Sequence, residues 1–327
     1  MRVLVCGGAG YIGSNMTAML AAEGYEPVVF DNLSKGHKSA IGGTEFVEGD
    51  LADSRLLIET LEKYDIEAAM HFAAFIEVAE SVQAPLRYYR NNLCCTENLL
   101  TAMESVGAEK FVFSSTAAVY GIPEETPITE DSPTKPINPY GQTKLAVEGM
   151  CRDQCRTGKL AYVSLRYFNA CGAGNNAALG EDHRPESHLI PLTIQAAMGK
   201  SSDIKIYGTD YDTPDGTCIR DYIHIDDLCR AHLLALDWLD QGRELICNLG
   251  NEKGHSVREV IETVRNVSGK DFKVTEADRR PGDPPRLTAD ATKARKELGW
   301  KIEKPDLEEM VLTAWQWHSN NPNGYPD

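Results

Sequence analysis

The chain has 327 residues, of which 42% are apolar, and a formal net charge of −16, from 33 Lys and Arg against 49 Asp and Glu. This length can bury one large core or two lobes, and no apolar run is long enough to cross a membrane. The acidic balance argues against binding to a nucleic-acid backbone. The nine cysteines lack zinc-ligand spacing, so we expect them to be reduced core residues.

A glycine loop follows the first predicted strand. Residues 3–6 form an apolar run typical of a buried strand, and Gly7, Gly10 and Gly13 then give the spacing Gly-x-x-Gly-x-x-Gly before a predicted helix. Such a loop brings backbone N–H groups close to a pyrophosphate, although a glycine turn can also be purely structural. Because the strand begins at once and leaves no room for a signal peptide, we expect a cytoplasmic protein.

An acidic residue ends the second predicted strand, residues 27–30. Asp31 follows Gly13 at the separation where a carboxylate accepts hydrogen bonds from the adenosine ribose. A carboxylate at this place repels a 2′-phosphate. The sequence therefore favours NAD over NADP as cofactor.

Strands and helices continue to alternate as far as residue 167. Further strands are predicted at 44–47, 68–72, 110–113 and 161–166, with helices at 56–61 and from Pro85 to Met103. This pattern predicts an α/β fold with a doubly wound parallel (Rossmann) sheet over residues 1–167. A smaller C-terminal α/β domain is expected over residues 168–327, with residues 222–248 returning to the first domain.

Tyr140 and Lys144 follow Pro139, which can open a helix, so they should lie one turn apart on one helix face. A cation beside a phenol favours the phenolate and would lower its pKa, which makes the pair a candidate general base. The commoner outcome of this spacing is a solvated pair. Thr116 ends the fifth strand at the sheet edge where ligands lie, which favours the base.

These motifs, together with Ser-Ser-Thr-Ala-Ala-Val-Tyr-Gly at 114–121, resemble the extended short-chain dehydrogenase/reductase family and, within it, the UDP-sugar 4-epimerases. The segments SPTKPINPYGQTKLAVE, RYFNACGAG, GTCIRDYIHIDDL and RRPGDPP occur in that family's order, so the resemblance covers nearly the whole chain. It implies an isomerase that interconverts UDP-glucose and UDP-galactose through C4 oxidation and hydride return on tightly bound NAD. It also implies a homodimer.

The resemblance assigns roles to individual residues. Tyr140 would be the base, Lys144 would hold the nicotinamide ribose, and Thr116 would bond the sugar O4. The implied cofactor-binding residues are Gly7, Gly10, Tyr11, Ile12, Gly13, Asp31, Asn32, Asp50, Leu51, Phe72, Ala73, Ala74, Asn92, Ser114, Tyr140, Lys144 and Phe168. The implied UDP-sugar-binding residues are Thr116, Tyr140, Asn169, His188, Leu189, Lys205, Tyr207, Arg220, Arg280, Asp283 and Leu287.

Several points remain open at this level. Thr116 stands where the family commonly has Ser, and Ile76 stands where some members have Lys. Arg220 and Arg280 suit bidentate contacts to phosphate, but without the resemblance each would more often form a surface ion pair. No metal site is predicted, because His188 is placed at a family position that is often Asn.

Other functions compete with epimerisation of UDP-glucose. Leu287 stands at the family position that limits the size of the sugar pocket, and its side chain has an intermediate volume. UDP-N-acetylhexosamines, UDP-pentoses and UDP-uronates therefore stay possible substrates. A 4,6-dehydratase would need an acid beside the strand-five hydroxyl, whereas Ala117 and Ala118 follow Thr116. A non-catalytic NAD-binding protein would not need the Tyr, Lys and hydroxyl set.

Overall fold

A parallel sheet forms the centre of the first lobe in the computed structural model, which describes residues 1–240, 242–280 and 282–326. The sheet has seven strands in the order β10-β6-β5-β4-β1-β2-β3. Their bounds are β1 Arg2–Cys6, β2 Glu26–Asp31, β3 Glu45–Glu48, β4 Ala68–His71, β5 Lys110–Thr116, β6 Ala161–Tyr167 and β10 Glu244–Leu249. The strand order reverses between β1 and β4, where open α/β sheets bind ligands beyond the carboxyl ends of the strands.

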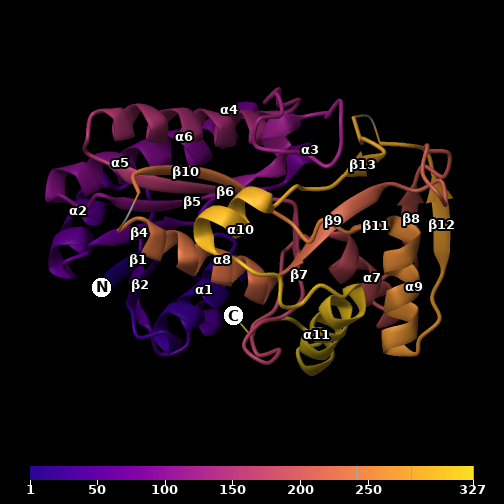
Figure 1. Cartoon of the computed structure of the whole chain (residues 1–327). Coiled ribbons are helices and arrows are strands. Elements are labelled where there is room, and N and C mark those ends of the chain that lie inside the picture. Colours follow the sequence, from indigo (N-terminus) through magenta and orange to yellow (C-terminus); the bar gives the residue numbers. More distant parts are fainter. Residues whose placement is uncertain (241, 281, 327) are drawn as a thin grey trace.

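Helices cover both faces of this sheet (Figure 1). On one face lie α2 Ser54–Lys63, α5 Cys95–Val106 and α6 Pro139–Arg156; on the other lie α1 Tyr11–Ala22, α8 Ile225–Trp238 and α10 Thr292–Leu298. Each face of the sheet has its own hydrophobic core, because successive side chains of β1 point to opposite faces. Val3 and Val5 pack on the α1 and α8 side, while Leu4 and Cys6 pack on the other. The Rossmann-type fold predicted from the sequence is confirmed.

The chain between β4 and β5 differs from the single helix that the sequence predicts at 85–103. A short helix, α3 Val78–Gln83, comes first, and α4 Pro85–Tyr88 then continues through a π-helical turn, η2 Tyr89–Cys94, into α5. A π-turn adds one residue to the turn and rotates the side chains that follow it. The turn contains Asn92, which is buried.

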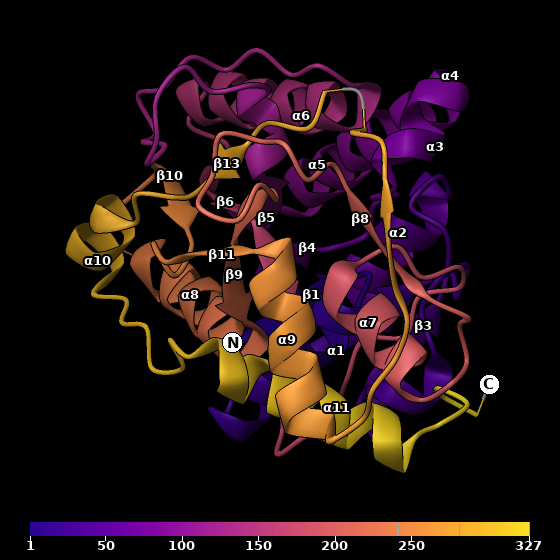
Figure 2. The same cartoon turned by 90° about the vertical axis from the view of Figure 1, so that its right-hand side faces the viewer.

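A second lobe packs beside the carboxyl edge of the sheet (Figure 2). It has a four-stranded sheet of β7 Asn169–Cys171, β9 Ile219–His224, β11 Gly254–Ser256 and β13 Arg286–Leu287, and a pair of strands, β8 Ile204–Tyr207 and β12 Val274–Ala277. Its helices are α7 Leu189–Ala197, α9 Val257–Ser268 and α11 Leu307–Asn320. Two 3-10 turns in the first lobe, η1 Lys38–Ile41 and η3 Ala117–Tyr120, come after β2 and β5.

A histidine caps the start of α8. The helix begins at Ile225, and His224 accepts a hydrogen bond from the N–H of Asp226 at 3.1 Å. The Asp227 carboxylate instead accepts the N–H groups of Glu303 and Lys304, both at 3.0 Å. Among the described residues, every helix is too short or too polar to cross a membrane.

Candidate active site

The glycine loop after β1 is held against the end of β4. Gly7 has a φ of +78°, and a Cβ there would lie 2.5 Å from the backbone nitrogen of Ala73. A Cβ at Gly13 would lie 2.0 Å from the carbonyl oxygen of Gly7. Both positions therefore require glycine. Within the described chain no side chain caps the first turn of α1, so its N–H groups are available to an anion.

Asp31 at the end of β2 fixes this loop. Its carboxylate accepts the N–H of Ala9 at 3.0 Å and that of Leu33 at 2.8 Å. Burial raises the pKa of Asp31, while these two hydrogen bonds lower it in part. Beside it, the Asn32 amide donates to Asp50 at 2.8 Å. The polar residues expected at the ribose thus lie together at the ends of β2 and β3.

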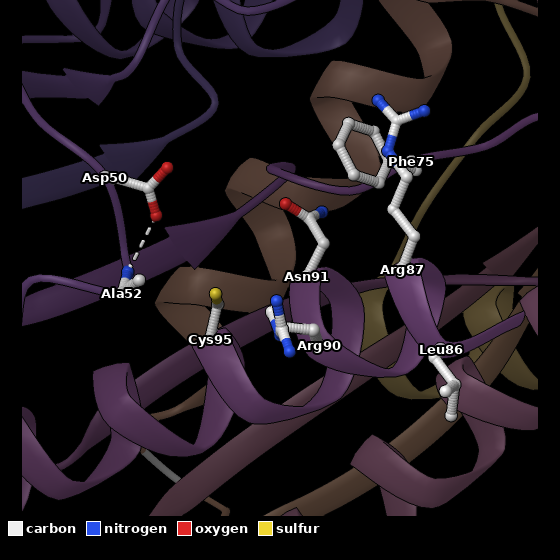
Figure 3. A pocket seen from close by; sticks show the side chains of 8 residues that line it. All are labelled: Asp50, Ala52, Phe75, Leu86, Arg87, Arg90, Asn91 and Cys95. Atoms are coloured by element: carbon white, nitrogen blue, oxygen red, sulfur yellow. Dashed lines mark hydrogen bonds between the residues drawn. The ribbon is translucent and has the colours of Figure 1, made fainter. Parts of the chain in front are cut away.

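A cavity of about 360 Å³ opens next to Asp50, one of the residues expected at the cofactor (Figure 3). The Arg87 guanidinium lies 4.3 Å from the centre of the Phe75 ring on one wall. Asp50 is fixed by the N–H of Ala52 at 2.8 Å on the other. The lining residues are Asp50, Ala52, Phe75, Leu86, Arg87, Arg90, Asn91 and Cys95. This volume is large enough for a planar base.

Asn92, which the sequence places at the cofactor, forms several hydrogen bonds within the protein. Its amide accepts the N–H of Phe75 and donates to the carbonyl of Phe75, both at 2.9 Å, and it also donates to Thr143 at 3.3 Å. The side chain is 2% exposed. These bonds occupy the amide, so Asn92 joins the loop after β4 to α6 and positions it.

The helix α6 brings Tyr140 to Thr116. Asn138 caps the helix by accepting the N–H of Gly141 at 2.8 Å. A Cβ on Gly141 would lie 2.5 Å from the carbonyl oxygen of Ala118, so glycine permits α6 to pack directly on η3. The Tyr140 side chain is half-buried, and the Thr116 hydroxyl is near enough to lower the pKa of its phenol. The helical spacing and the strand end thus meet as the sequence predicts.

Lys144 lies one turn further along α6 and is 4% exposed. Its ammonium donates to the carbonyl of Ser114 at 2.8 Å and lies 4.8 Å from the centre of the Phe113 ring. Burial lowers the pKa of Lys144 to about 7, although the charge of Glu148 raises it in part. The lysine can therefore lose its proton near neutral pH.

The pKa of Tyr140 runs opposite to the expectation from the sequence. Burial raises the pKa above its usual value, and the hydrogen bond from Thr116 offsets only part of that rise. Lys144 is not among the groups that perturb it. A ligand must change this balance before Tyr140 can act as a base.

A buried network beneath α6 was not predicted from the sequence. The Arg166 guanidinium forms a bidentate pair with Glu148, at 2.9 and 2.5 Å, and its third contact is the Tyr120 hydroxyl at 2.9 Å. Ser115 donates to the same carboxylate at 2.6 Å. Glu148 is 0% exposed. Since the partners come from η3, α6 and the ends of β5 and β6, no local motif could have paired them.

Tyr167 is a second residue that the sequence did not single out. At the end of β6 its hydroxyl hydrogen-bonds Ser114, the residue whose carbonyl holds Lys144. Burial raises the pKa of Tyr167, and the nearby Tyr140 raises it further. The phenols of Tyr167 and Tyr140 are thus electrostatic neighbours at the sheet edge.

In the second lobe, the expected phosphate residues meet around one carboxylate. Arg280 Nε lies 2.8 Å from Asp283, and Arg220 Nη2 lies 3.5 Å from it. Arg220 is also fixed by the carbonyls of Ile219 and Pro284, both at 2.9 Å. Arg280 lies over the Tyr207 ring at 5.2 Å. Arg220 is 13% and Arg280 59% exposed at the side chain, so only Arg280 can swing freely.

The other expected sugar residues are spread over the second lobe. Leu287 pairs with Arg220 in the sheet and packs near Val119 and Tyr120, close to η3. The Asn169 amide donates to the carbonyl of Asp221 at 2.7 Å, which uses one of its hydrogen-bonding groups. Of the remaining residues expected at the UDP-sugar, Lys205 is exposed on β8, Leu189 begins α7, and His188 pairs with Glu181. The first turn of α1 contains Tyr11 and Ile12. The segments that follow β3, β4 and β6 contain Leu51, Phe72, Ala74 and Phe168.

The fold and this site define a dinucleotide-binding α/β protein with a Tyr, Lys and hydroxyl set at the sheet edge. Residues 3–250 match the model of the NAD dependent epimerase/dehydratase family, and the chain belongs to that family. A UDP-glucose 4-epimerase of Halalkalibacterium halodurans is 49% identical over 99% of this chain and 98% of its own length.

Two solved structures are also similar. The UDP-glucose 4-epimerase of Brucella ovis in complex with NAD has a TM-score of 0.94 and 48% identity, covering 97% of this chain and 98% of that one. The UDP-Glc/GlcNAc 4-epimerase of Campylobacter jejuni has a TM-score of 0.86 and 44% identity, covering 98% and 99%. The resemblance expected from the sequence is confirmed.

Proposed function

We propose that the chain interconverts UDP-glucose and UDP-galactose by inversion at C4, with tightly bound NAD as cofactor. The observation that carries the proposal is the grouping of half-buried Tyr140 with the buried Thr116 and Lys144 at the sheet edge next to the glycine loop. The full-length similarity to proteins named UDP-glucose 4-epimerase supports the substrate.

The residues at the carboxyl edge fit NAD. The space above Gly7 and Gly13, which a Cβ would fill, lets backbone N–H groups at α1 reach a pyrophosphate. The Asp31 carboxylate would accept hydrogen bonds from the ribose hydroxyls, and the cavity beside Asp50 would bind the adenine. Lys144 would hold the nicotinamide ribose. NAD would supply an acceptor and donor for the C4 hydride.

In the proposed mechanism the protein transfers one proton to and from the sugar O4 and holds the sugar in place. Tyr140 accepts the O4 proton when C4 is oxidised and returns it when C4 is reduced, while Thr116 hydrogen-bonds O4. The negative charge that develops at O4 favours protonated Lys144. Because a substrate excludes water from this buried edge, the Tyr140–Lys144 attraction strengthens as the site fills.

The second lobe would hold the UDP end. Arg220 is preset by two backbone carbonyls, and Arg280 can swing from Asp283 onto a phosphate. Binding at UDP that leaves the hexose loosely held would allow the sugar to present either face to the hydride donor. We also propose the division into an NAD-binding domain, 1–167 with a return near 222–248, and a UDP-sugar domain, 168–327. Homodimerisation is proposed on family grounds, and a cytoplasmic location stays a prediction.

Action on UDP-N-acetylhexosamines is a second candidate. The Campylobacter jejuni relative, at 44% identity, is named for both glucose and N-acetylglucosamine sugars. Here the half-buried Leu287 packs against Val119 and Tyr120 of η3, and we place it where it would narrow the pocket around C2. This placement favours the smaller sugars.

The test is an assay of the purified chain with UDP-galactose and no added NAD, followed by separation of the products. We expect UDP-glucose in equilibrium with UDP-galactose. A product that has lost the 6-hydroxyl oxygen would instead indicate a dehydratase, and the absence of any conversion at saturating substrate and added NAD would refute both.

A further inference from the structure

Four potential metal ligands gather in the segment that leads into α7. Glu181, His183, Glu186 and His188 each offer one ligand atom, and these atoms all lie within 4.8 Å of one another. The sequence predicted no metal site here. None of the four is part of the Tyr140 site.

The distances are those between the ligands of a small cation. His183 Nδ1 lies 3.2 Å from Glu181 and 3.6 Å from Glu186, and His188 Nδ1 lies 3.8 Å from Glu186 and also contacts Glu181. A tetrahedral zinc ion with bonds of about 2.0–2.1 Å separates its ligand atoms by about 3.3 Å. Small shifts would thus place all four atoms around one ion.

Burial supplies an independent reason for a cation at this place. The side chains of Glu181 and Glu186 are both 4% exposed, and two such carboxylates facing each other need positive charge between them. Nδ1 of His183 is buried and, in the described part of the chain, makes no hydrogen bond of good geometry. This nitrogen faces both carboxylates of the cluster.

A supporting layer already orients one ligand. Glu186 Oε1, the oxygen that also faces His183 and His188, accepts the N–H groups of Ser187 at 2.7 Å and His188 at 2.9 Å, and these bonds fix the direction of the carboxylate. Hydrogen bonds of this kind fix ligating groups in metal sites. The rings of His183 and His188 meet edge to face at 5.2 Å, so both nitrogens approach from different directions.

We propose that Glu181, His183, Glu186 and His188 bind one divalent transition-metal ion, for which zinc is the best fit. Two imidazole nitrogens with two carboxylates suit zinc, whereas magnesium and calcium prefer oxygen ligands alone. Four protein ligands leave no open position for a substrate, so the role is structural.

The ion would fix a junction between three segments. Asp182 lies in the chain between Glu181 and His183. Its backbone carbonyl lies 3.1 Å from the His37 ring nitrogen Nε2, and its carboxylate accepts the N–H of Tyr325 at 2.9 Å. Lys35 donates to the carbonyl of Arg184 at 3.4 Å. Residues 35–37 come shortly after Asp31 in the chain. A bound metal would therefore hold the loop beside the proposed ribose site and the C-terminal residues in place.

Metal content and affinity test the proposal on the full chain without a histidine tag. The protein, with its cofactor retained, is stripped with a chelator, dialysed against buffered Zn²⁺ and measured by mass spectrometry. We expect one zinc ion per chain. His183→Gln and His188→Gln should each weaken binding more than about 100-fold, since removing even an outer-shell partner of a ligand costs about 10–100-fold. His255→Gln, a histidine outside the cluster, is the matched control and should bind as the original does.

Cobalt distinguishes this site from the cysteines. Co²⁺ at a site of nitrogen and oxygen ligands gives weak visible bands, whereas thiolate ligation adds strong near-ultraviolet absorption; Cys94 is exposed and is replaced by Ser as a second control. Circular dichroism of each variant checks the fold. Zinc that binds equally to the His183→Gln and His188→Gln variants, or a thiolate cobalt spectrum, would mean an adventitious ion only and would overturn the proposal.

Hydrogen exchange adds a second readout. Chelation should reduce protection of residues 33–38 in the original chain and leave the His183→Gln variant unchanged, because that variant holds no ion to lose. Equal protection with and without zinc in the original chain would refute the structural role.

Discussion

The two ends of the proposed site are built in different ways. At the sheet edge, Tyr140, Lys144 and Thr116 are placed by one helix turn and one strand end, and Lys144 and Thr116 are buried. In the second lobe, Arg220 on β9 meets Asp283 and Arg280 of a single distant loop, where the two arginines share one carboxylate and Arg280 is largely exposed. The first end is rigid and suited to chemistry. The second is adjustable and suited to holding a nucleotide.

The largest expected effect tests the chemical end. Tyr140→Phe removes the base, and general-base catalysis contributes about 10²–10⁴-fold, so we expect kcat to fall about 10³-fold. Calorimetry should find UDP binding unchanged. Tyr207→Phe, which keeps the ring beneath Arg280, is the control and should change kcat less than about twofold. More than a tenth of the original turnover in Tyr140→Phe would disprove the assignment.

Glu148→Gln tests the rigidity of that end. Arg166 would keep its buried charge without a charged partner, which should lower the free energy of unfolding by about 3 kcal/mol in urea titrations. Because Glu148 raises the pKa of Lys144, its loss should move that pKa below about 7. The ammonium is lost as pH rises, so the alkaline decline in kcat should move to lower pH.

The control for Glu148→Gln is Glu104→Gln, in the exposed pair of Glu104 with Lys159. It should change the free energy of unfolding by less than about 0.5 kcal/mol. An unshifted pH profile in Glu148→Gln would show that Glu148 does not set the charge of Lys144.

Leu287→Gly tests whether the two ends meet at the sugar. Removing this side chain should open the pocket, and activity with UDP-N-acetylglucosamine should rise about tenfold relative to UDP-glucose, as measured by the ratio of kcat/KM values. Ile122→Gly, at an exposed loop position, should leave the ratio unchanged. The same ratio in both variants would remove Leu287 as the gate.

The smallest effect belongs to the adjustable end. Arg280→Met should weaken UDP binding about fivefold and leave kcat within about twofold. The difference in UDP affinity between the variant and the original chain should disappear at high salt, because salt screens an exposed guanidinium. Arg55→Met, in a surface pair with Glu59, serves as the control and should leave the Kd of UDP unchanged. A large fall in kcat on losing Arg280 would contradict the separation of binding from chemistry.

The sequence by itself determined the features that arise from local periodicity. Gly7 to Gly13, Asp31 at a strand end, and the spacing of Tyr140 and Lys144 depend on residues close in the chain, so the Rossmann fold and one end of the site were predictable. The π-turn around Asn92 was not, because its helical pattern is that of a regular helix, and only packing against Phe75 and Thr143 reveals it.

Only the tertiary structure decided the pKa values of the site residues and which charged side chains pair. The pKa of Lys144 near 7 and the raised pKa of Tyr140 come from burial, which the sequence cannot state for one side chain. It also decided that Asp283 joins two arginines and that His183 and His188 share two glutamates. Electrostatic energies depend on distance and desolvation in three dimensions, and those are fixed only when distant segments pack together.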